Sequence, residues 1–500
     1  MVFVLLTNRF AYINSASDEE LSKLSDFWSF YSAKAHFTPS HQLWIQERIK
    51  AKRAGDPNRK CAGWDGRIRL LKRGKVPAGL FRATRKEIKD TLGIQFRVKL
   101  HRPDIQPYQP GFVVSDPKYS YQNDCTQAML KALPRGGGIV LAATRTGKTA
   151  TASQFFSKLP YSCLFVVDQL DLLDQSQQEL AYWLHEEVGY IGDAIYDPKR
   201  VTVATRQTLS QHLNEKKFMD WYEHVEVVIV DELHEALNDS NFSILEAIKP
   251  IARYGLTATL QLQKKEINLR AYAFAGPLIF SFPIEEGVKR GVLTKGRVVQ
   301  LLFEPVPIAS DGYQEEYRHQ VVEHEVKAKA IKSMIELLLS SGRYVVLLTD
   351  RVLHVKGLST LFEKTDHRLA YGAVEKIKRA AARASMDDGS LRLIIANKVW
   401  RKGITIKRVD AMIDCAEMKD KNTAVQKFGR GIGLHPDKTD LIYIDIGTDG
   451  KNRFHKAARS RARAWRSDNI EVKTIRVSSA DHAVKTLQKE LMTSREKKCE

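Results

Sequence analysis

The stretch Ile139-Val-Leu-Ala-Ala-Thr-Arg-Thr-Gly-Lys-Thr149 joins an apolar run to a loop that ends in Gly-Lys-Thr. In a phosphate-binding loop, backbone N–H groups and a helix N-terminus face the phosphates, and a Lys reaches the terminal pair. A Ser or Thr hydroxyl then holds the magnesium ion. The stretch therefore predicts a nucleotide-binding loop, and its members are Thr144, Arg145, Thr146, Gly147, Lys148 and Thr149.

An acidic pair, Asp231 and Glu232, directly follows the apolar residues 225–230 in the sequence Asp-Glu-Leu-His. Ligands of parallel sheets bind at the carboxyl ends of the strands, so this pair is expected beside the phosphates. We expect Asp231 to hold Mg²⁺ together with Thr149, and Glu232 to orient and deprotonate the attacking water. The two motifs together predict hydrolysis of ATP, with Lys148 as a catalytic cation and Mg²⁺ as cofactor.

Short apolar runs alternate with segments of helical spacing along most of the chain. One series comprises residues 139–142, 163–167, 201–205, 227–230 and 255–259, and a second comprises 344–349, 391–396, 411–415 and 441–446. Near-continuous apolar runs are typical of buried parallel strands, and their alternation with helices predicts an α/β fold. We expect two tandem parallel-sheet lobes, over residues 113–297 and 298–450, joined near residues 290–325.

The two ends of the chain carry its charge. The net charge is +20; residues 48–102 hold 18 Lys and Arg against 4 Asp and Glu, and residues 451–500 hold 14 against 6. This favours a polyanionic partner, a nucleic acid or an anionic membrane surface. We expect residues 1–112 to form a small basic α+β DNA-binding domain and residues 451–500 a basic extension.

Apolar runs and cysteines limit the class of protein. No apolar run reaches the 18 or so residues of a membrane span, so no membrane partner is expected. The five cysteines lie far apart and no His cluster has metal-ligand spacing, which argues against a disulfide framework or a zinc site. The cytoplasm is the expected location, and no obligate protein partner is evident.

Basic side chains at both ends are candidate contacts to a phosphate backbone. Around Trp64-Asp-Gly66 the sequence alternates apolar and basic residues, so one face could pack while the other faces nucleic acid. The candidates there are Arg67, Arg69, Lys72 and Arg73. In the cationic segment 451–466 they are Arg459 and Arg463; the alternative is a helix docked on the second lobe with its arginines in solvent.

The order of these motifs resembles the superfamily 2 helicases of the DExH type, from about residue 118 to 447. The resemblance implies RecA-like lobes and adds further site residues by motif. Gln122 is the candidate for adenine binding, and Thr205 and Gln207 lie within the strand-contacting segments 166–175 and 204–209. The residues that would couple hydrolysis to movement of the lobes are Thr257, Thr259 and Gly403. Gln426 and Arg430 are the candidates for catalysis in the second lobe.

Two positions depart from that family's pattern. Thr405 stands where the family has Asp, and Gly433 stands where it has a second arginine. An arginine near the terminal phosphate accelerates hydrolysis greatly, so the departure at Gly433 bears on the rate of hydrolysis by this chain. Arg430 could act alone, or Lys427 or Lys438 could replace the second arginine.

The basic N-terminal block resembles the N-terminal domain of the UvsW-type helicases of tailed phages. That resemblance implies a DNA helicase or translocase acting on branched or forked DNA in recombination, repair and fork processing, in the host cytoplasm if the chain is phage-encoded. Two alternatives stay open. One is an RNA helicase or a duplex translocase that does not unwind; the other is a junction-binding or annealing protein with a weak regulatory ATPase.

Overall fold

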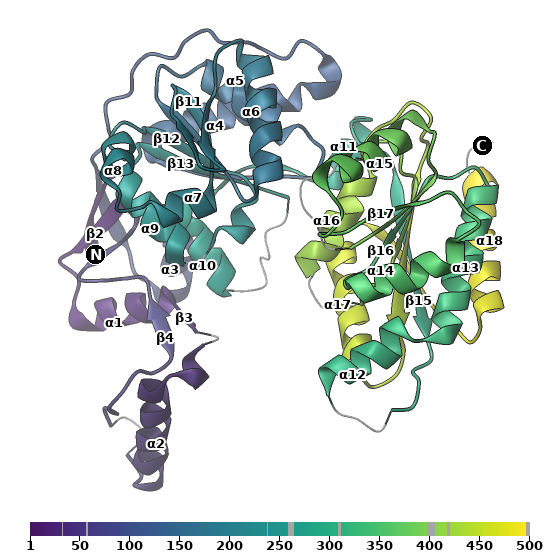
Figure 1. The fold of residues 1–500 in the computed structure, drawn as a ribbon. Coiled ribbons are helices and arrows are strands. Elements are labelled where there is room, and N and C mark those ends of the chain that lie inside the picture. Colours follow the sequence, from purple (N-terminus) through teal and green to yellow (C-terminus); the bar gives the residue numbers. More distant parts are fainter. Residues whose placement is uncertain are drawn as a thin grey trace. The chain divides into compact units, whose positions relative to one another are not determined.

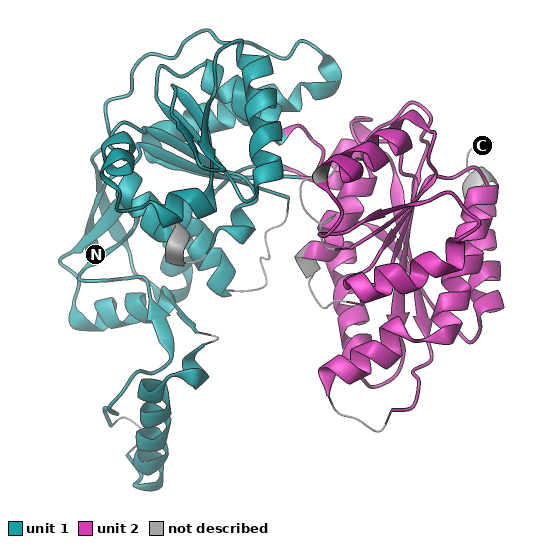
Figure 2. Ribbon diagram, in the orientation of Figure 1, with its two compact units in different colours: residues 1–142, 148–281 teal, residues 143–147, 282–500 magenta. Residues whose placement is uncertain are grey.

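The computed structural model describes the chain except residues 33, 57–58, 238, 259–264, 309–311, 398–405, 418–420 and 497–500. The predicted site residues Thr259 and Gly403, and the departure at Thr405, lie outside the described residues. The chain divides into two compact units, residues 1–142 with 148–281 and residues 143–147 with 282–500 (Figure 2). None of the helices in the described ranges has both the length and the apolar character needed to span a bilayer.

The helices are distributed over both units (Figure 1). Those of the first unit are α1 (Asp18–Phe27), α2 (Pro39–Arg53), α3 (Ala78–Leu92), α4 (Tyr121–Ala132), α5 (Lys148–Ser157), α6 (Leu170–Leu184), α7 (Arg206–Gln211), α8 (Lys216–Tyr222), α9 (Asp239–Ile248) and α10 (Lys265–Phe274). Those of the second are α11 (Ile284–Lys289), α12 (Tyr313–Tyr317), α13 (Glu325–Ser340), α14 (Val352–Ser359), α15 (Lys376–Asp388), α16 (Lys421–Gly431), α17 (Arg453–Ser467) and α18 (Ala480–Glu496).

The N-terminal residues form a four-stranded sheet in the order β5-β2-β1-β6. Its strands are β1 (Val2–Leu6), β2 (Phe10–Asn14), β5 (Lys75–Pro77) and β6 (Phe96–Leu100). The apolar opening of the chain is thus an inner strand, antiparallel to β2 and parallel to β6. A separate two-stranded sheet pairs β3 (Ser29–Tyr31) with β4 (Arg67–Arg69).

This N-terminal sheet shares a hydrophobic core with the first lobe. Trp28 and Phe81 lie in one buried cluster with Leu269 and Ala273 of α10. At Gly79 of α3, a Cβ would stand 2.4 Å from the carbonyl oxygen of Tyr272, so α3 and α10 approach closely at this glycine. Removal of the N-terminal residues would therefore expose apolar surface of the first lobe.

The first lobe is built on an eight-stranded sheet in the order β10-β9-β11-β8-β12-β13-β7-β14. Its strands are β7 (Gly137–Ala142), β8 (Cys163–Val167), β9 (Gly189–Gly192), β10 (Ile195–Asp197), β11 (Val201–Thr205), β12 (Val227–Val230), β13 (Ala252–Thr257) and β14 (Leu278–Phe282). The inner pairs from β9 to β7 are parallel, and β9 and β10 form an antiparallel hairpin. β8, β11 and β12 have the predicted bounds.

The second lobe is built on a seven-stranded sheet in the order β17-β18-β16-β19-β20-β15-β21, with every pair parallel. Its strands are β15 (Gly296–Phe303), β16 (Val345–Leu348), β17 (Arg368–Ala370), β18 (Leu393–Ala396), β19 (Ala411–Asp414), β20 (Leu441–Thr448) and β21 (Glu471–Val477). Part of the expected joint is thus a full strand, β15, between β20 and β21. Glycines and prolines on both sides made this apolar run resemble a linker.

Residues 451–500 are built into the second lobe, where the sequence predicted an extension. β21 pairs with β15 along its whole length, and α18 packs on α13. In α17, Trp465 is fully buried and its Nε1 donates to the carbonyl oxygen of Ala424 at 3.2 Å. The helix is thus docked on the second lobe, as the alternative interpretation of the cationic segment 451–466 predicts.

One arginine of α17 points into the protein. Arg461 is 3% exposed, and its Nε and Nη2 both donate to the carboxylate of Asp445 at 2.9 Å. Gln300 also donates to this carboxylate, at 2.8 Å. Arg459 and Arg463 of the same helix are exposed.

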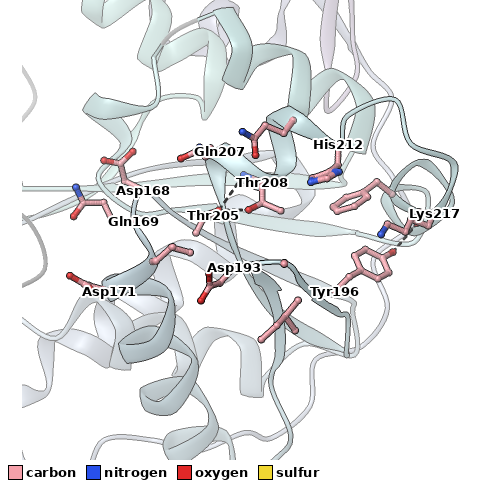
Figure 3. A pocket seen from close by; sticks show the side chains of 15 residues that line it. Asp168, Gln169, Asp171, Asp193, Tyr196, Thr205, Gln207, Thr208, His212 and Lys217 are labelled. Atoms are coloured by element: carbon pink, nitrogen blue, oxygen red, sulfur yellow. Dashed lines mark hydrogen bonds between the residues drawn. The ribbon is translucent and has the colours of Figure 1, made fainter. Parts of the chain in front are cut away.

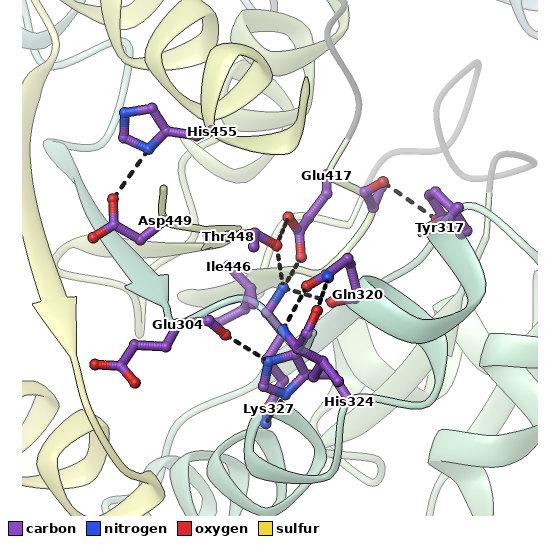
Figure 4. A network of polar contacts seen from close by, with 12 residues as sticks. Glu304, Tyr317, Gln320, His324, Lys327, Glu417, Ile446, Thr448, Asp449 and His455 are labelled. Carbon is purple, nitrogen blue, oxygen red and sulfur yellow. Dashed lines mark hydrogen bonds and ion pairs between the residues drawn. The ribbon is translucent and has the colours of Figure 1, made fainter. Parts of the chain in front are cut away.

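A second buried polar network joins α13 to the carboxyl end of β20 (Figure 4). Lys327 is 2% exposed, forms an ion pair with Glu417 and donates to Thr448 Oγ1 at 2.7 Å. Thr448 donates in turn to Glu417 Oε2 at 2.8 Å. Because each charge has an opposite partner and hydrogen bonds, the network is satisfied without solvent.

Replacing Arg461 by Ala should lower the free energy of unfolding of the second unit by about 3–5 kcal/mol, because Asp445 would keep a buried charge without its main partner. Urea denaturation followed by tryptophan fluorescence measures this. Arg459→Ala, on the exposed side of the same helix, is the matched control and should change stability by about 0.5 kcal/mol or less. Equal effects of the two substitutions would contradict the assigned role of the ion pair.

Candidate functional site: a phosphate-binding loop beside a strand-contacting edge

The phosphate-binding loop connects β7 to α5. β7 ends at Ala142 and α5 begins at Lys148, so Lys148 and Thr149 stand in the first turn of that helix. Gly147 has φ +71°, a conformation that glycine adopts without strain. The Thr146 hydroxyl donates to the carbonyl oxygen of Ala143 at 2.7 Å and closes the loop.

The acidic pair lies beside Lys148, as the two motifs predict. Nζ of Lys148 is 3.9 Å from Oε1 of Glu232. Asp231 follows β12, its backbone N–H donates to the carbonyl oxygen of Val166, and its carboxylate accepts the Glu232 N–H at 2.9 Å. Burial and the neighbouring Glu232 charge raise the pKa of Asp231 to about 6, while Lys148 opposes the rise. An added cation would relieve this crowding of carboxylates.

A third carboxylate, which the sequence reasoning missed, is bonded to Thr149. Glu179 of α6 accepts a hydrogen bond from the Thr149 side chain and interacts with the charge of Asp231. Burial raises the pKa of Glu179 and the Thr149 bond lowers it. A position thirty residues beyond the loop, inside a helix, carries no motif that could have revealed it.

These donors fit a nucleotide with Mg²⁺. Mg²⁺ is held by one or two protein oxygens together with substrate phosphates and water. Thr149, which is hydrogen-bonded to Glu179, and Asp231, whose charge interacts with that of Glu179, supply such oxygens. Lys148 and the N–H groups of the loop supply positive charge for the phosphates. Glu232, with φ +47°, is held in the left-handed region directly after Asp231.

His234 connects the acidic pair to β13. Its Nδ1 lies 3.1 Å from Oγ1 of Thr257 and 3.5 Å from Oε2 of Glu232. Thr257 is fully buried at the end of its strand. His234 therefore lies between Thr257, which the family resemblance assigns to coupling hydrolysis with lobe movement, and Glu232, the predicted base.

Gln122, predicted for adenine, is buried at the start of α4, directly after Tyr121. α4 packs against α5, and the Thr126 hydroxyl donates to Oε1 of Gln154 at 2.7 Å. The helix that carries Gln122 is thus fixed to the helix that carries Lys148.

The two predicted strand-contacting segments meet at the carboxyl ends of β8 and β11. Arg206, 8% exposed, forms an ion pair with Asp168 and donates to the carbonyl oxygen of Glu235 at 2.5 Å. It thereby ties the loops after β8, β11 and β12 together. Thr205 caps α7 by accepting the Thr208 N–H at 3.2 Å, and Gln207 is exposed.

The predicted catalytic residues of the second unit lie on α16. Gln426 and Arg430 are one helical turn apart and both partly exposed. The proposed substitutes for the second arginine are engaged elsewhere. Lys427 donates to both carboxylate oxygens of Asp414, at 2.8 and 2.6 Å, and Lys438 donates to the carbonyl oxygen of Gly433 at 3.0 Å.

Residues 143–147 pack within the second unit, and Arg145 lies beside Gly433 there. Nη2 of Arg145 donates to the carbonyl oxygen of Arg430 at 3.0 Å. A Cβ at position 433 would stand 3.4 Å from Nη1 of Arg145. An arginine at 433 would bring like charges together, so Arg145 and the glycine at 433 are compatible with each other where two arginines would not be.

The basic candidates of the N-terminal residues differ in whether a neighbouring carboxylate neutralises their charge. Arg69 donates to both carboxylate oxygens of Asp65, at 3.0 and 2.6 Å, while Arg67 is exposed on the same strand. Lys72 and Arg73 are exposed at a tight turn, in which Arg73 and the following glycine both have positive φ. The turn therefore presents the more accessible cations.

Further cations that the site prediction omitted lie on α2, which projects away from the four-stranded and eight-stranded sheets of its unit (Figure 1). They are the exposed residues Arg48, Lys50, Lys52 and Arg53. These four cations belong to the charge excess of residues 48–102, and that excess is the feature of the sequence from which they could have been predicted as contacts.

Replacing His234 by Ala should lower the rate of ATP hydrolysis about 10- to 100-fold with little change in nucleotide affinity, because it removes the link between Glu232 and Thr257 without touching Lys148. Steady-state kinetics with a fluorescent-nucleotide titration measures both quantities. The exposed His224→Ala serves as control. Unchanged hydrolysis in the His234 variant would show that the link is unnecessary.

Residues 117–262 match the family described as "Type III restriction enzyme, res subunit". No curated protein matches the chain.

Many solved structures are similar to this chain, including the following three. A fragment of a putative HsdR subunit of a type I restriction enzyme from Vibrio vulnificus YJ016 has a TM-score of 0.53 and 15% identity, with 90% of this chain and 84% of that one covered. S. cerevisiae Dbp5 bound to RNA and ADP BeF3 has a TM-score of 0.52 and 12% identity, with 75% and 97% covered. T4 UvsW has a TM-score of 0.44 and 17% identity, with 95% and 99% covered. The fold prediction is confirmed: the chain has two RecA-like parallel-sheet lobes, as the solved structures with TM-scores above 0.5 do, and its first lobe carries the family match.

Proposed function

We propose that this chain is an ATP-dependent DNA helicase or translocase that unwinds or branch-migrates forked and junction DNA. The observation that carries the proposal is the grouping of Lys148, Asp231 and Glu232 at one edge of the first sheet, with His234 leading to Thr257. The strand-contacting segments end at the same edge.

The chemistry follows from the positions of these side chains. Lys148 is placed to neutralise phosphate charge, and Thr149 and Asp231 would hold Mg²⁺, which would supply further positive charge to the phosphates. Glu232 orients water and accepts its proton, and Nζ of Lys148 lies 3.9 Å from its carboxylate. Arg430 of the second lobe is the cation proposed to stabilise the developing negative charge.

The nucleic-acid role rests on the basic surface of the N-terminal residues. Lys72 and Arg73 at the turn, together with the exposed cations of α2, offer accessible positive charge outside the motor's own motifs. Contacts of this kind bind the phosphate backbone irrespective of sequence. A basic surface outside the motifs that contact the tracked strand suits duplex or branched DNA, because a second DNA segment lies beside that strand.

RNA is the second candidate substrate. The fold is shared with Dbp5, whose structure is described as bound to RNA. Nothing in the loop or the acidic pair distinguishes the two polymers, because both motifs contact nucleotide and water only.

ATPase assays with no nucleic acid, single-stranded DNA, four-way DNA and RNA should show stimulation by DNA, greatest with the branched form. Glu232→Gln should keep nucleotide binding and lose about 10²–10⁴-fold in hydrolysis, because the base is removed while Lys148 stays. Unwinding of the same substrates is measured in parallel. Absence of stimulation by every polymer would exclude a motor and leave the junction-binding alternative.

Replacing Lys72 and Arg73 together by Ala should reduce the slope of log K against log salt for duplex DNA by roughly 2, since each phosphate contact contributes about 0.9. The double variant Lys329→Ala, Lys332→Ala on α13 removes the same charge from an exposed helix and should leave the slope unchanged. Fluorescence anisotropy over a salt series provides the measurement. These substitutions are preferable to a truncation because the N-terminal sheet and α10 share a core. Identical slopes in the two double variants would remove the turn from the DNA contact.

A further inference from the structure

A cavity of about 730 Å³ opens beside the strand-contacting segments of the first lobe (Figure 3). It is lined by the loop after β8, the turn between β9 and β10, and the loop and helix after β11. Its size lies within the roughly 300–1,000 Å³ of small-molecule sites, which is more than a single ion needs.

One end of the cavity is formed by flat rings. His212 stacks on Phe218 with the ring centroids 5.0 Å apart and the planes 8° from parallel. Tyr196 packs against Phe218 at 4.8 Å, and Nζ of Lys217 lies 5.0 Å from the Tyr196 centroid. Such surfaces accept the face of a planar aromatic ligand.

The opposite end is polar and acidic. In Figure 3 the side chains of Asp168, Gln169 and Asp171 lie across the cavity from the rings, and Asp193 lies near its middle. A phosphate group in this space would meet several carboxylates, and of the lining residues only Lys217 carries a full positive charge. Carboxylates instead accept hydrogen bonds from amino groups, such as N4 of cytosine.

We propose that this cavity binds a nucleobase with an exocyclic amino group, with its face on the ring end and its amino group toward the carboxylates. The proposal rests on the proposed function, since the base is taken from the single strand held by the first lobe. Thr205, Thr208 and Gln207 line the same cavity, so a strand running along the end of β11 would pass its entrance.

The geometry also gives the cavity a route to the hydrolysis site. Asp168 in its wall is the ion-pair partner of Arg206, and Arg206 donates to the carbonyl oxygen of Glu235 in the Asp-Glu-Leu-His-Glu loop. An occupant that contacts Asp168 is thus connected, through the Asp168–Arg206 ion pair and the Arg206 hydrogen bond to Glu235, to the loop that carries the acidic pair.

Three labelled oligonucleotides of about twelve residues test the site: oligo(dC), oligo(dT) and an abasic deoxyribose-phosphate chain of the same charge. Anisotropy at one salt concentration should give about three- to tenfold tighter binding of oligo(dC) than of oligo(dT), the worth of one hydrogen bond. The abasic chain should bind about tenfold or more weakly than oligo(dT), because stacking is lost.

Two variants address the two ends of the cavity. Asp193→Asn should make oligo(dC) and oligo(dT) bind equally; Asn tolerates the left-handed backbone of this position, where φ is +49°. His212→Ala should weaken both oligonucleotides by a similar factor and leave the abasic chain unaffected. Asp197→Asn, in the same hairpin but outside the cavity, is the matched control and should behave as the parent protein.

The outcomes separate this proposal from the proposed function. Equal affinity for abasic and base-bearing chains, or an oligo(dC) preference that survives in Asp193→Asn, would overturn the base site while DNA-stimulated ATPase still stood. Binding of cytidine monophosphate that Asp193→Asn abolishes, without any effect of that variant on oligonucleotides, would mean that the base comes from a free nucleotide and would overturn the strand as its source.

Discussion

Parallel strands joined by crossover helices present their carboxyl ends at one edge of the sheet. In the first lobe this constraint brings together residues that are spread over nearly ninety positions of the chain: the loop after β7, Asp168 after β8, Arg206 after β11, and Asp231 after β12. The 3.9 Å approach of Lys148 and Glu232 and the Arg206–Asp168 ion pair both follow from it. The candidate nucleotide site and the predicted strand-contacting segments share one edge because the strands are parallel.

The loops at that edge are held by buried polar contacts. His234 stands between Glu232 and Thr257, and Arg206 fixes two neighbouring loops. In a water-poor environment such contacts are strong when satisfied and costly when broken, so they favour a small number of discrete arrangements. An edge of this kind can respond as a unit when a nucleotide or a strand binds.

In the second lobe, some basic side chains form buried ion pairs that stabilise the fold, while others are exposed and could contact a ligand. Arg461, Lys327 and Lys427 are each buried against a carboxylate, and none of the three is available to a phosphate backbone. Among the C-terminal residues, Arg461 is withdrawn from the charge excess in this way. Arg459 and Arg463 lie on the exposed side of the same helix, α17.

The sequence by itself determined the α/β class, most strands of both lobes and the placing of the Gly-Lys-Thr loop and the acidic pair after their strands, because those features are local. An apolar run followed by Gly-Lys-Thr or Asp-Glu specifies a strand and its terminal loop within a few residues. Only the tertiary structure decided that β15 and β21 complete the second sheet, that Glu179 bonds Thr149, that Arg69 is matched by Asp65, and that a cavity lies beyond Thr205. Each of these depends on which distant segments pack together, and pairing between segments leaves no periodic trace in either one.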